Sequence, residues 1–294
     1  MDEDKKELWN RFNEIHKRLY SDVKDGDMKA FIYSFRRGFL ANMGVEEFQN
    51  YKIDMEELLS LMLQIVGDHD PFSVVGQVDS IRLHKKSTTT ICDSFDFPVL
   101  NAVDIDDGIA RYNKCNAYVF DCWRKSLRVC KQGDYALAIF LSILALEEAA
   151  KFHQAWYELF YNDGKPLNSS KSACETRRND YKCNHRKKHF VSVISGAMLN
   201  HRIERLFGTE RVSRFVKMVD GGGLESVRQT CLYATLGDNG PVYPDDVVTR
   251  DDAVFYVLFC GEAIGEFIYA TPWEYRAFKE EMDKEIEGFG LPVP

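Results

Sequence analysis

The segment that decides the fold runs from Tyr135 to Phe160 and has the sequence YALAIFLSILALEEAAKFHQAWYELF. Its first part, as far as Leu146, is apolar on nearly every side, which is typical of a helix in the middle of a bundle. This apolar run of about twelve residues is too short to cross a bilayer. Asp134 follows Gly133 and is expected to cap the helix. The segment therefore predicts a buried central helix.

Apolar stripes at helical spacing flank this segment on both sides. The capping residues and stripes predict further helices over residues 104–127, 185–207 and 251–268, and a final one after Pro272. We predict an all-α fold, a helical bundle over residues 99–294. Residues 1–98 are predicted to form an N-terminal helical extension, with Met28, Phe31 and Ile32 facing inward. Within the extension, Ser80–Phe97 alternates in polarity and predicts a short β-hairpin or an extended connector.

Composition limits the function classes. The 294 residues carry a net charge of -8, so contact with nucleic acid would need a local basic patch. The eight cysteines form no C-x-x-C pair, which gives no support to a zinc knuckle. No P-loop or dinucleotide-binding motif is present, and we expect no cofactor. The charged N-terminus has no apolar leader, so we expect a cytoplasmic protein with no membrane contact.

Two acidic residues and a lysine, Glu147, Glu148 and Lys151, emerge from the apolar half of the central helix. One interpretation is an ordinary helical ion pair between Glu147 and Lys151, at i,i+4 spacing. The other is a polar cluster that orients a histidine or arginine from a neighbouring helix.

A basic segment lies between the central helix and the next one. Residues 171–188 hold seven Lys or Arg against two acids, a local charge of +5. Such a patch attracts phosphate groups and predicts an RNA-binding surface, although a solvated loop explains the charges equally well. The predicted binding residues here are Asn179, Lys182, Arg186, Lys187 and, just beyond, His189.

The same segment carries residues suited to RNA cleavage without a metal. Histidine can move protons on and off the 2′-hydroxyl and the leaving oxygen. Arginine can stabilise the charge of the phosphorane. Arg178 and His185, with six residues between them, are the candidates. His185 and His189 have the i,i+4 spacing of a metal pair, but no carboxylate accompanies them as in HExxH, so we predict no metal.

The order of these features resembles the AbiV family of abortive-infection (phage-defence) proteins. An Asn116-Ala117-Tyr118 helix and a Gly-Asp break precede the central helix. The E-E-x-x-K of the family matches Glu147, Glu148 and Lys151, and its H-x-x-K matches His185 and Lys188. Its R-x-x-x-L-Y-like element matches Arg228, Leu232 and Tyr233. The resemblance covers roughly residues 104–270.

The resemblance implies a domain of the HEPN superfamily, many of whose members are metal-independent ribonucleases with an R-x(4-6)-H motif. Arg178 to His185 fits that motif at its longest spacing. Alternatively, His185 and Lys188 form the centre and Arg228 supplies the guanidinium. The resemblance also implies a homodimer, in which each subunit contributes a histidine to one cleft.

Three hypotheses follow for the function. The first is an RNA-cleaving toxin, with His185 as acid or base, Arg178 and Lys188 on phosphate, and Glu147 or Glu148 orienting them. The second is a non-catalytic effector that binds RNA, the translation machinery or a phage protein, such as a phage-encoded activator. The third is a structural polar network in a dimer interface. Further binding residues are predicted at Lys151, Arg228 and Tyr233.

Overall fold

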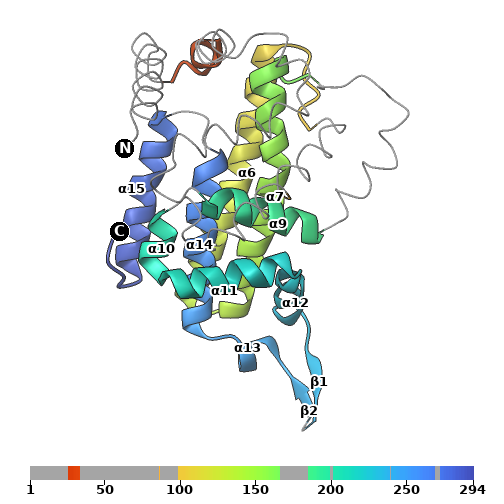
Figure 1. Ribbon diagram of the computed structural model, residues 1–294, viewed down its shortest axis with the longest axis vertical. Coiled ribbons are helices and arrows are strands. Elements are labelled where there is room, and N and C mark those ends of the chain that lie inside the picture. The colour runs from red at the N-terminus through yellow and green to blue at the C-terminus, as the bar shows by residue number, and fades with distance from the viewer. Residues whose placement is uncertain are drawn as a thin grey trace, which may run out of the picture.

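The computed structural model describes residues 26–33, 86, 99–165, 185–198, 201–238, 240–268 and 272–294. Its described part is a helical bundle with one small two-stranded sheet, so the all-α prediction is confirmed (Figure 1). The β-hairpin predicted at Ser80–Phe97 lies outside these residues. No helix in the described ranges is long and apolar enough to cross a membrane.

The two longest helices of the described residues, α6 (Ile105–Gln132) and α7 (Tyr135–Asn162), form an antiparallel pair. Their connection depends on local caps. Gly133 ends α6 with φ 91°, a conformation that glycine adopts without strain. The Asp134 side chain then accepts a hydrogen bond from the backbone N–H of Leu137, as its predicted capping role requires.

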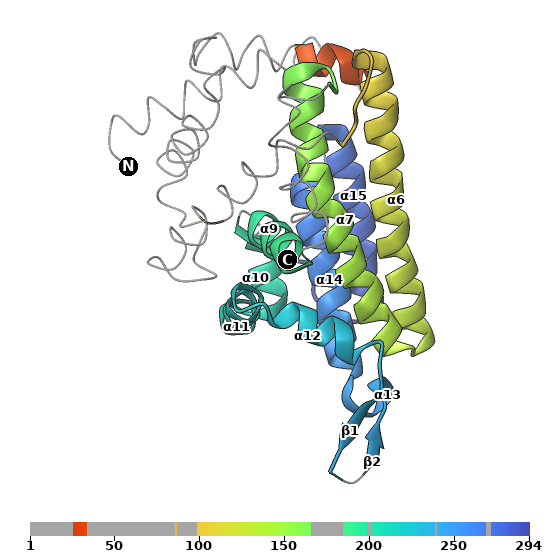
Figure 2. The same cartoon turned by 90° about the vertical axis from the view of Figure 1, so that its right-hand side faces the viewer.

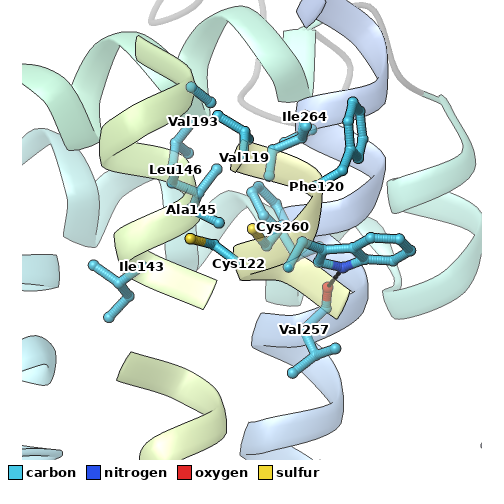
Figure 3. Close-up of a cluster of buried hydrophobic side chains, with 14 of the residues drawn as sticks. Val119, Phe120, Cys122, Ile143, Ala145, Leu146, Val193, Val257, Cys260 and Ile264 are labelled. Carbon is cyan, nitrogen blue, oxygen red and sulfur yellow. Dashed lines mark hydrogen bonds between the residues drawn. The ribbon is translucent and has the colours of Figure 1, made fainter. Parts of the chain in front are cut away.

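Two C-terminal helices, α14 (Arg250–Ile268) and α15 (Pro272–Gly288), complete a four-helix bundle with α6 and α7. The core lies between them. Trp123 of α6 is fully buried and donates from its indole nitrogen to the carbonyl of Val257 in α14, at 3.0 Å (Figure 3). Phe278 of α15 packs against Trp123 and Phe120. Burial of these aromatic side chains contributes the largest apolar areas of the bundle.

A second group of helices lies across one side of the bundle: α9 (His185–Met198), α10 (His201–Phe207), α11 (Thr209–Asp220) and α12 (Gly223–Thr230). Helix α9 crosses α7 and α14 instead of running along them (Figures 1 and 2). The crossing is close, since a Cβ added at Gly196 would lie 2.6 Å from the Cβ of Ala263. One helix was expected over residues 185–207. The structure describes two helices there, α9 and α10, and residues 199–200 between them lie outside the described residues.

A small hairpin follows α12. Strands β1 (Thr235–Gly237) and β2 (Gly240–Val242) pair antiparallel, and the short helix α13 (Pro244–Val247) follows. Both views show the hairpin projecting beyond one end of the bundle (Figures 1 and 2). The sequence predicted no strands in this region.

Residues 26–33 and the segment that begins at Val99 are held at the end of α7 opposite the hairpin (Figure 2). Met28, Phe31 and Ile32 are buried in the same hydrophobic core as the bundle helices, as predicted. Glu158, itself buried, accepts hydrogen bonds from the backbone N–H groups of Val99 and Leu100, both at 2.7 Å. Burial raises the pKa of Glu158 to about 7 even though these hydrogen bonds act to lower it.

Candidate active site

The carboxylate of Glu147 is the centre of the candidate site. It lies on α7, where α9 crosses, and is only 4% exposed. One oxygen is 2.7 Å from Nδ1 of His185 and the other is 2.7 Å from Nε2 of His189. The two histidines are one turn apart on α9, so the same face of that helix presents both rings to one carboxylate. The polar half of the central helix thus holds two histidines in place.

This geometry assigns the tautomers of both histidines. An ionised carboxylate only accepts hydrogen bonds, so the ring nitrogen that faces Glu147 carries the proton in each histidine. His185 is then protonated on Nδ1, and its Nε2 is left as the basic nitrogen. The His185 side chain is 40% exposed, whereas His189 is 1% exposed. Of the two, His185 is therefore the residue that a substrate can reach.

Helix α12 brings a guanidinium beside the same carboxylate. Nε of Arg228 lies 3.8 Å from Glu147. Arg228 is held by Glu225, one turn earlier on α12, through two parallel contacts of 2.6 and 2.9 Å. The side-chain amide of Gln229 also donates to the Glu225 carboxylate, at 2.7 Å. Because Glu225 binds two of the three guanidinium nitrogens, Nε and one Nη, Arg228 stays near Glu147 without displacing either histidine.

The charges of the site are mutually stabilising. Burial raises the pKa of Glu147, but the hydrogen bonds and charges of His189 and then His185 outweigh it and hold this pKa below its ordinary value. Hydrogen bonding by Arg228 lowers the pKa of Glu225 to about 2. The bond to Glu225 raises the pKa of Arg228 in turn. Both carboxylates are therefore ionised at neutral pH.

Three of these residues could also be considered as metal ligands. Glu147, His189 and Glu225 each offer an atom, and these atoms lie within 4.8 Å of one another. Arg228, however, already pairs with Glu225 and lies 3.8 Å from Glu147, so its positive charge would repel a cation bound by these carboxylates. A metal could bind here only if it displaced the guanidinium.

His189 has a further unusual feature. Its Nδ1 is buried, and no group in the described part of the chain forms a hydrogen bond with it. An unpaired buried nitrogen of this kind costs free energy, of the order of 1–3 kcal/mol. The hydrogen bond of Nε2 to Glu147 offsets part of that cost. His189 therefore depends on Glu147 more than the exposed His185 does.

Other predicted site residues lie next to this cluster, on α7 and in the first turn of α9. Glu148 pairs with Lys151 at 2.5 Å, so the predicted pairing of Lys151 with Glu147 is wrong. The reason is that Glu147 faces α9, whereas Glu148 is one residue further round the helix. In the first turn of α9, Arg186 is exposed, Lys187 is half-buried and Lys188 is buried.

The remaining predicted residues lie at the edges of this region or beyond it. Tyr233, just after α12, is 60% exposed. Arg178, Asn179 and Lys182 lie outside the described residues. The spacing of Arg178 and His185 stays a prediction, whereas Arg228 is in the described structure and contacts the carboxylate that binds His185.

Glu225 was missed by sequence reasoning. Its only signal is the i,i+3 spacing to Arg228, which surface helices commonly show. The importance of that pair is visible only when α12 is placed against α7.

The fold and this site define the class: a helical bundle in which a buried glutamate orients two histidines beside an arginine. A family model described as AbiV, of the HEPN type, matches residues 109–264, more than half of the chain. The chain therefore belongs to the AbiV family of HEPN abortive-infection proteins. No curated protein and no solved structure gives a significant match.

Proposed function

We propose that this protein is a cytoplasmic phage-defence effector that cleaves RNA without a metal ion and so stops translation or growth. The observation that carries the proposal is the hydrogen bond between Glu147 and Nδ1 of His185, beside Arg228. A carboxylate in this position raises the basicity of the opposite ring nitrogen and stabilises the imidazolium that forms. This is the arrangement that a general base requires.

The reaction follows from these roles. Nε2 of His185 removes the proton of a ribose 2′-hydroxyl, and the 2′-oxygen forms a bond to the adjacent phosphorus. The bond from phosphorus to the 5′-oxygen breaks, which leaves a 2′,3′-cyclic phosphate and a 5′-hydroxyl end. Arg228 is placed to neutralise the additional negative charge on the phosphorane oxygens. Glu147 positions His185, and Glu225 positions Arg228.

The leaving 5′-oxygen needs a proton from an acid. Lys188 is buried and His189 is bonded to Glu147, so neither presents a free acidic proton to the surface. We propose that the acid is His185 of a second subunit, as the homodimer implied by the family resemblance would allow. Phosphates on either side of the cleaved bond would be bound by exposed basic residues such as Arg186.

A second candidate is an effector that binds RNA, the translation machinery or a phage protein without cleaving it. The observation in its favour is the first turn of α9, where an exposed Arg186 and a half-buried Lys187 adjoin His185. A basic surface of this kind binds phosphate without catalysis. Binding alone would depend on the basic residues and not on His185.

One experiment separates the two candidates. Purified wild type, His185→Ala and Arg186→Ala are incubated with total cellular RNA in the presence of a chelator, and both cleavage and binding are measured. Cleavage that is lost in His185→Ala while RNA binding persists supports the enzyme. Binding that falls in Arg186→Ala, with no cleavage by the wild type even in phage-infected extract, supports the binding effector instead. Circular dichroism confirms that each variant is folded.

A further inference from the structure

We propose that the projecting hairpin formed by β1 and β2 is a self-association surface, where two copies of the chain join their β1 edges into one four-stranded sheet. This inference goes beyond the proposed RNA chemistry and does not depend on it. Five of the ten large hydrophobic residues exposed in the described structure lie in a sixteen-residue stretch around the hairpin. They are Leu232, Tyr233, Leu236, Tyr243 and Val247.

The hairpin lacks the support that small sheets need. Two strands of three residues each are marginal on their own, and a sheet generally needs at least three strands or a helix against it. Leu236, in the middle of β1, is 90% exposed. Within the described residues the sheet has only these two strands, so β1 keeps an open edge. An open edge next to exposed apolar side chains is a template for another strand.

The register determines which edge is open. Gly237 is opposite Gly240 across a two-residue turn, and in such a turn the carbonyl of the first residue accepts from the N–H of the last. Pairs alternate along an antiparallel ladder, so the next pair, Leu236 and Pro241, directs its backbone groups outward. Leu236 then offers both an N–H and a C=O. Pro241 has no N–H, which blocks addition of a strand to β2.

These constraints favour a second copy in one register. If two β1 strands meet antiparallel with Leu236 opposite Leu236, the two residues exchange both hydrogen bonds about a two-fold axis. Because Pro241 blocks both outer edges, the sheet itself closes at four strands and does not extend further. Asp238 then lies opposite Ala234 of the other copy. The two Asp238 carboxylates are four residues apart, about 13 Å, which exceeds the screening length at physiological salt.

The exposed area and the charge of the hairpin region also favour a second copy of the chain as the partner. An aromatic side chain presents about 150–250 Å². The five exposed residues therefore offer on the order of 500 Å² per copy, and a pair would bury about 1,000 Å² at most, if all five enter the interface, which reaches the lower bound of specific interfaces. Between Arg228 and Arg250 the charged residues are all acidic: Asp238, Asp245 and Asp246. A polyanion such as RNA is therefore a poor occupant of this surface.

The test is the oligomeric state of the full chain in the absence of RNA. Sedimentation velocity and light scattering are compared for wild type, Leu236→Asp and Val103→Asp. Val103, two residues before α6 begins and far in sequence from the hairpin, is 72% exposed and serves as the matched control. We expect wild type and Val103→Asp to dimerise, and Leu236→Asp to raise the dimer dissociation constant at least about tenfold, because two buried carboxylates would face each other.

The register is tested separately by crosslinking. Leu236→Cys should form a disulfide-linked dimer under mild oxidation, since paired antiparallel residues bring their Cα atoms within the range of a disulfide. Val103→Cys and the wild type give the background from random collision and from native cysteines. A wild type that stays monomeric at about 100 μM, or a dimer that is unchanged in Leu236→Asp and uncrosslinked in Leu236→Cys, overturns the proposal. In that case a different protein would be sought as the binding partner of the hairpin.

Discussion

Replacement of Glu147 gives the most direct test of the site, because two histidines depend on one buried carboxylate. Glu147→Ala removes both hydrogen bonds and leaves His189 buried with neither ring nitrogen paired. Removal of one partner from a buried charged pair costs about 3–5 kcal/mol. Glu147→Gln keeps the volume and one good acceptor. It loses the charge-assisted character of both bonds, and we expect a cost of about 2–3 kcal/mol.

The matched control lies one residue further along α7. Glu148→Ala breaks only a partly exposed pair with Lys151, so its cost should stay below about 1 kcal/mol. The free energy of unfolding is measured by urea titration, followed by far-UV circular dichroism. If Glu147→Ala and Glu148→Ala destabilise the protein equally, Glu147 does not hold the two histidines and the geometry of the site is wrong.

The pH dependence of this cost gives a second check. The pKa of Glu147 is lower in the folded protein than its ordinary value, so its stabilising contribution is fully present above about pH 4.5 and is lost as the pH falls through the folded value. The difference in stability between wild type and Glu147→Gln should therefore narrow between pH 7 and pH 3. A difference that stays constant over this range would contradict the assignment of an ionised Glu147.

Three further predictions concern other parts of the structure. The pKa of Glu158 is raised to about 7, so its ionisation opposes folding. Wild-type stability should fall by up to about 3 kcal/mol from pH 5 to pH 8, and Glu158→Gln should abolish that slope in urea titrations. Gly196→Ala would place a Cβ 2.6 Å from Ala263, and thermal unfolding should show a loss of about 1–3 kcal/mol. Glu225→Gln should free Arg228 and, in the RNA assay, lower kcat about tenfold or more with little change in KM, whereas Glu225→Asp should restore part of kcat. An equal loss in both Glu225 variants would indicate a merely structural role.

The fold could be predicted from sequence because its signals are local. Gly133 and Asp134 determine where α6 ends and α7 begins, and the apolar half of α7 identifies the central helix. Met28 and Phe31 were assigned to the core from their spacing alone, and both are buried. The hairpin was missed although Gly237-Asp238-Asn239-Gly240 contains residues typical of tight turns. Its strands are too short to show alternation.

The candidate site was only partly accessible to sequence reasoning. The i,i+4 spacing of His185 and His189 places both on one face of a helix. Their partner, Glu147, is 38 and 42 residues away, and the pairing depends on how α9 crosses α7. Sequence alone could not distinguish Glu147 from Glu148, because which carboxylate faces α9 is decided by packing. The role of Glu225 depends likewise on the position of α12.

The way Glu158 binds the chain before the bundle affects which sequences can precede the bundle. Its carboxylate binds backbone N–H groups at residues 99 and 100, and every amino acid except proline supplies that group. These hydrogen bonds themselves do not depend on the side chains of the two residues. The buried side chain of Leu100 and the partly buried side chain of Val99, which packs against the core, add steric requirements. The bundle can therefore accept different preceding sequences at this junction without a change at the candidate site around Glu147. A domain built in this way is suited to evolve with different N-terminal segments attached to the same bundle.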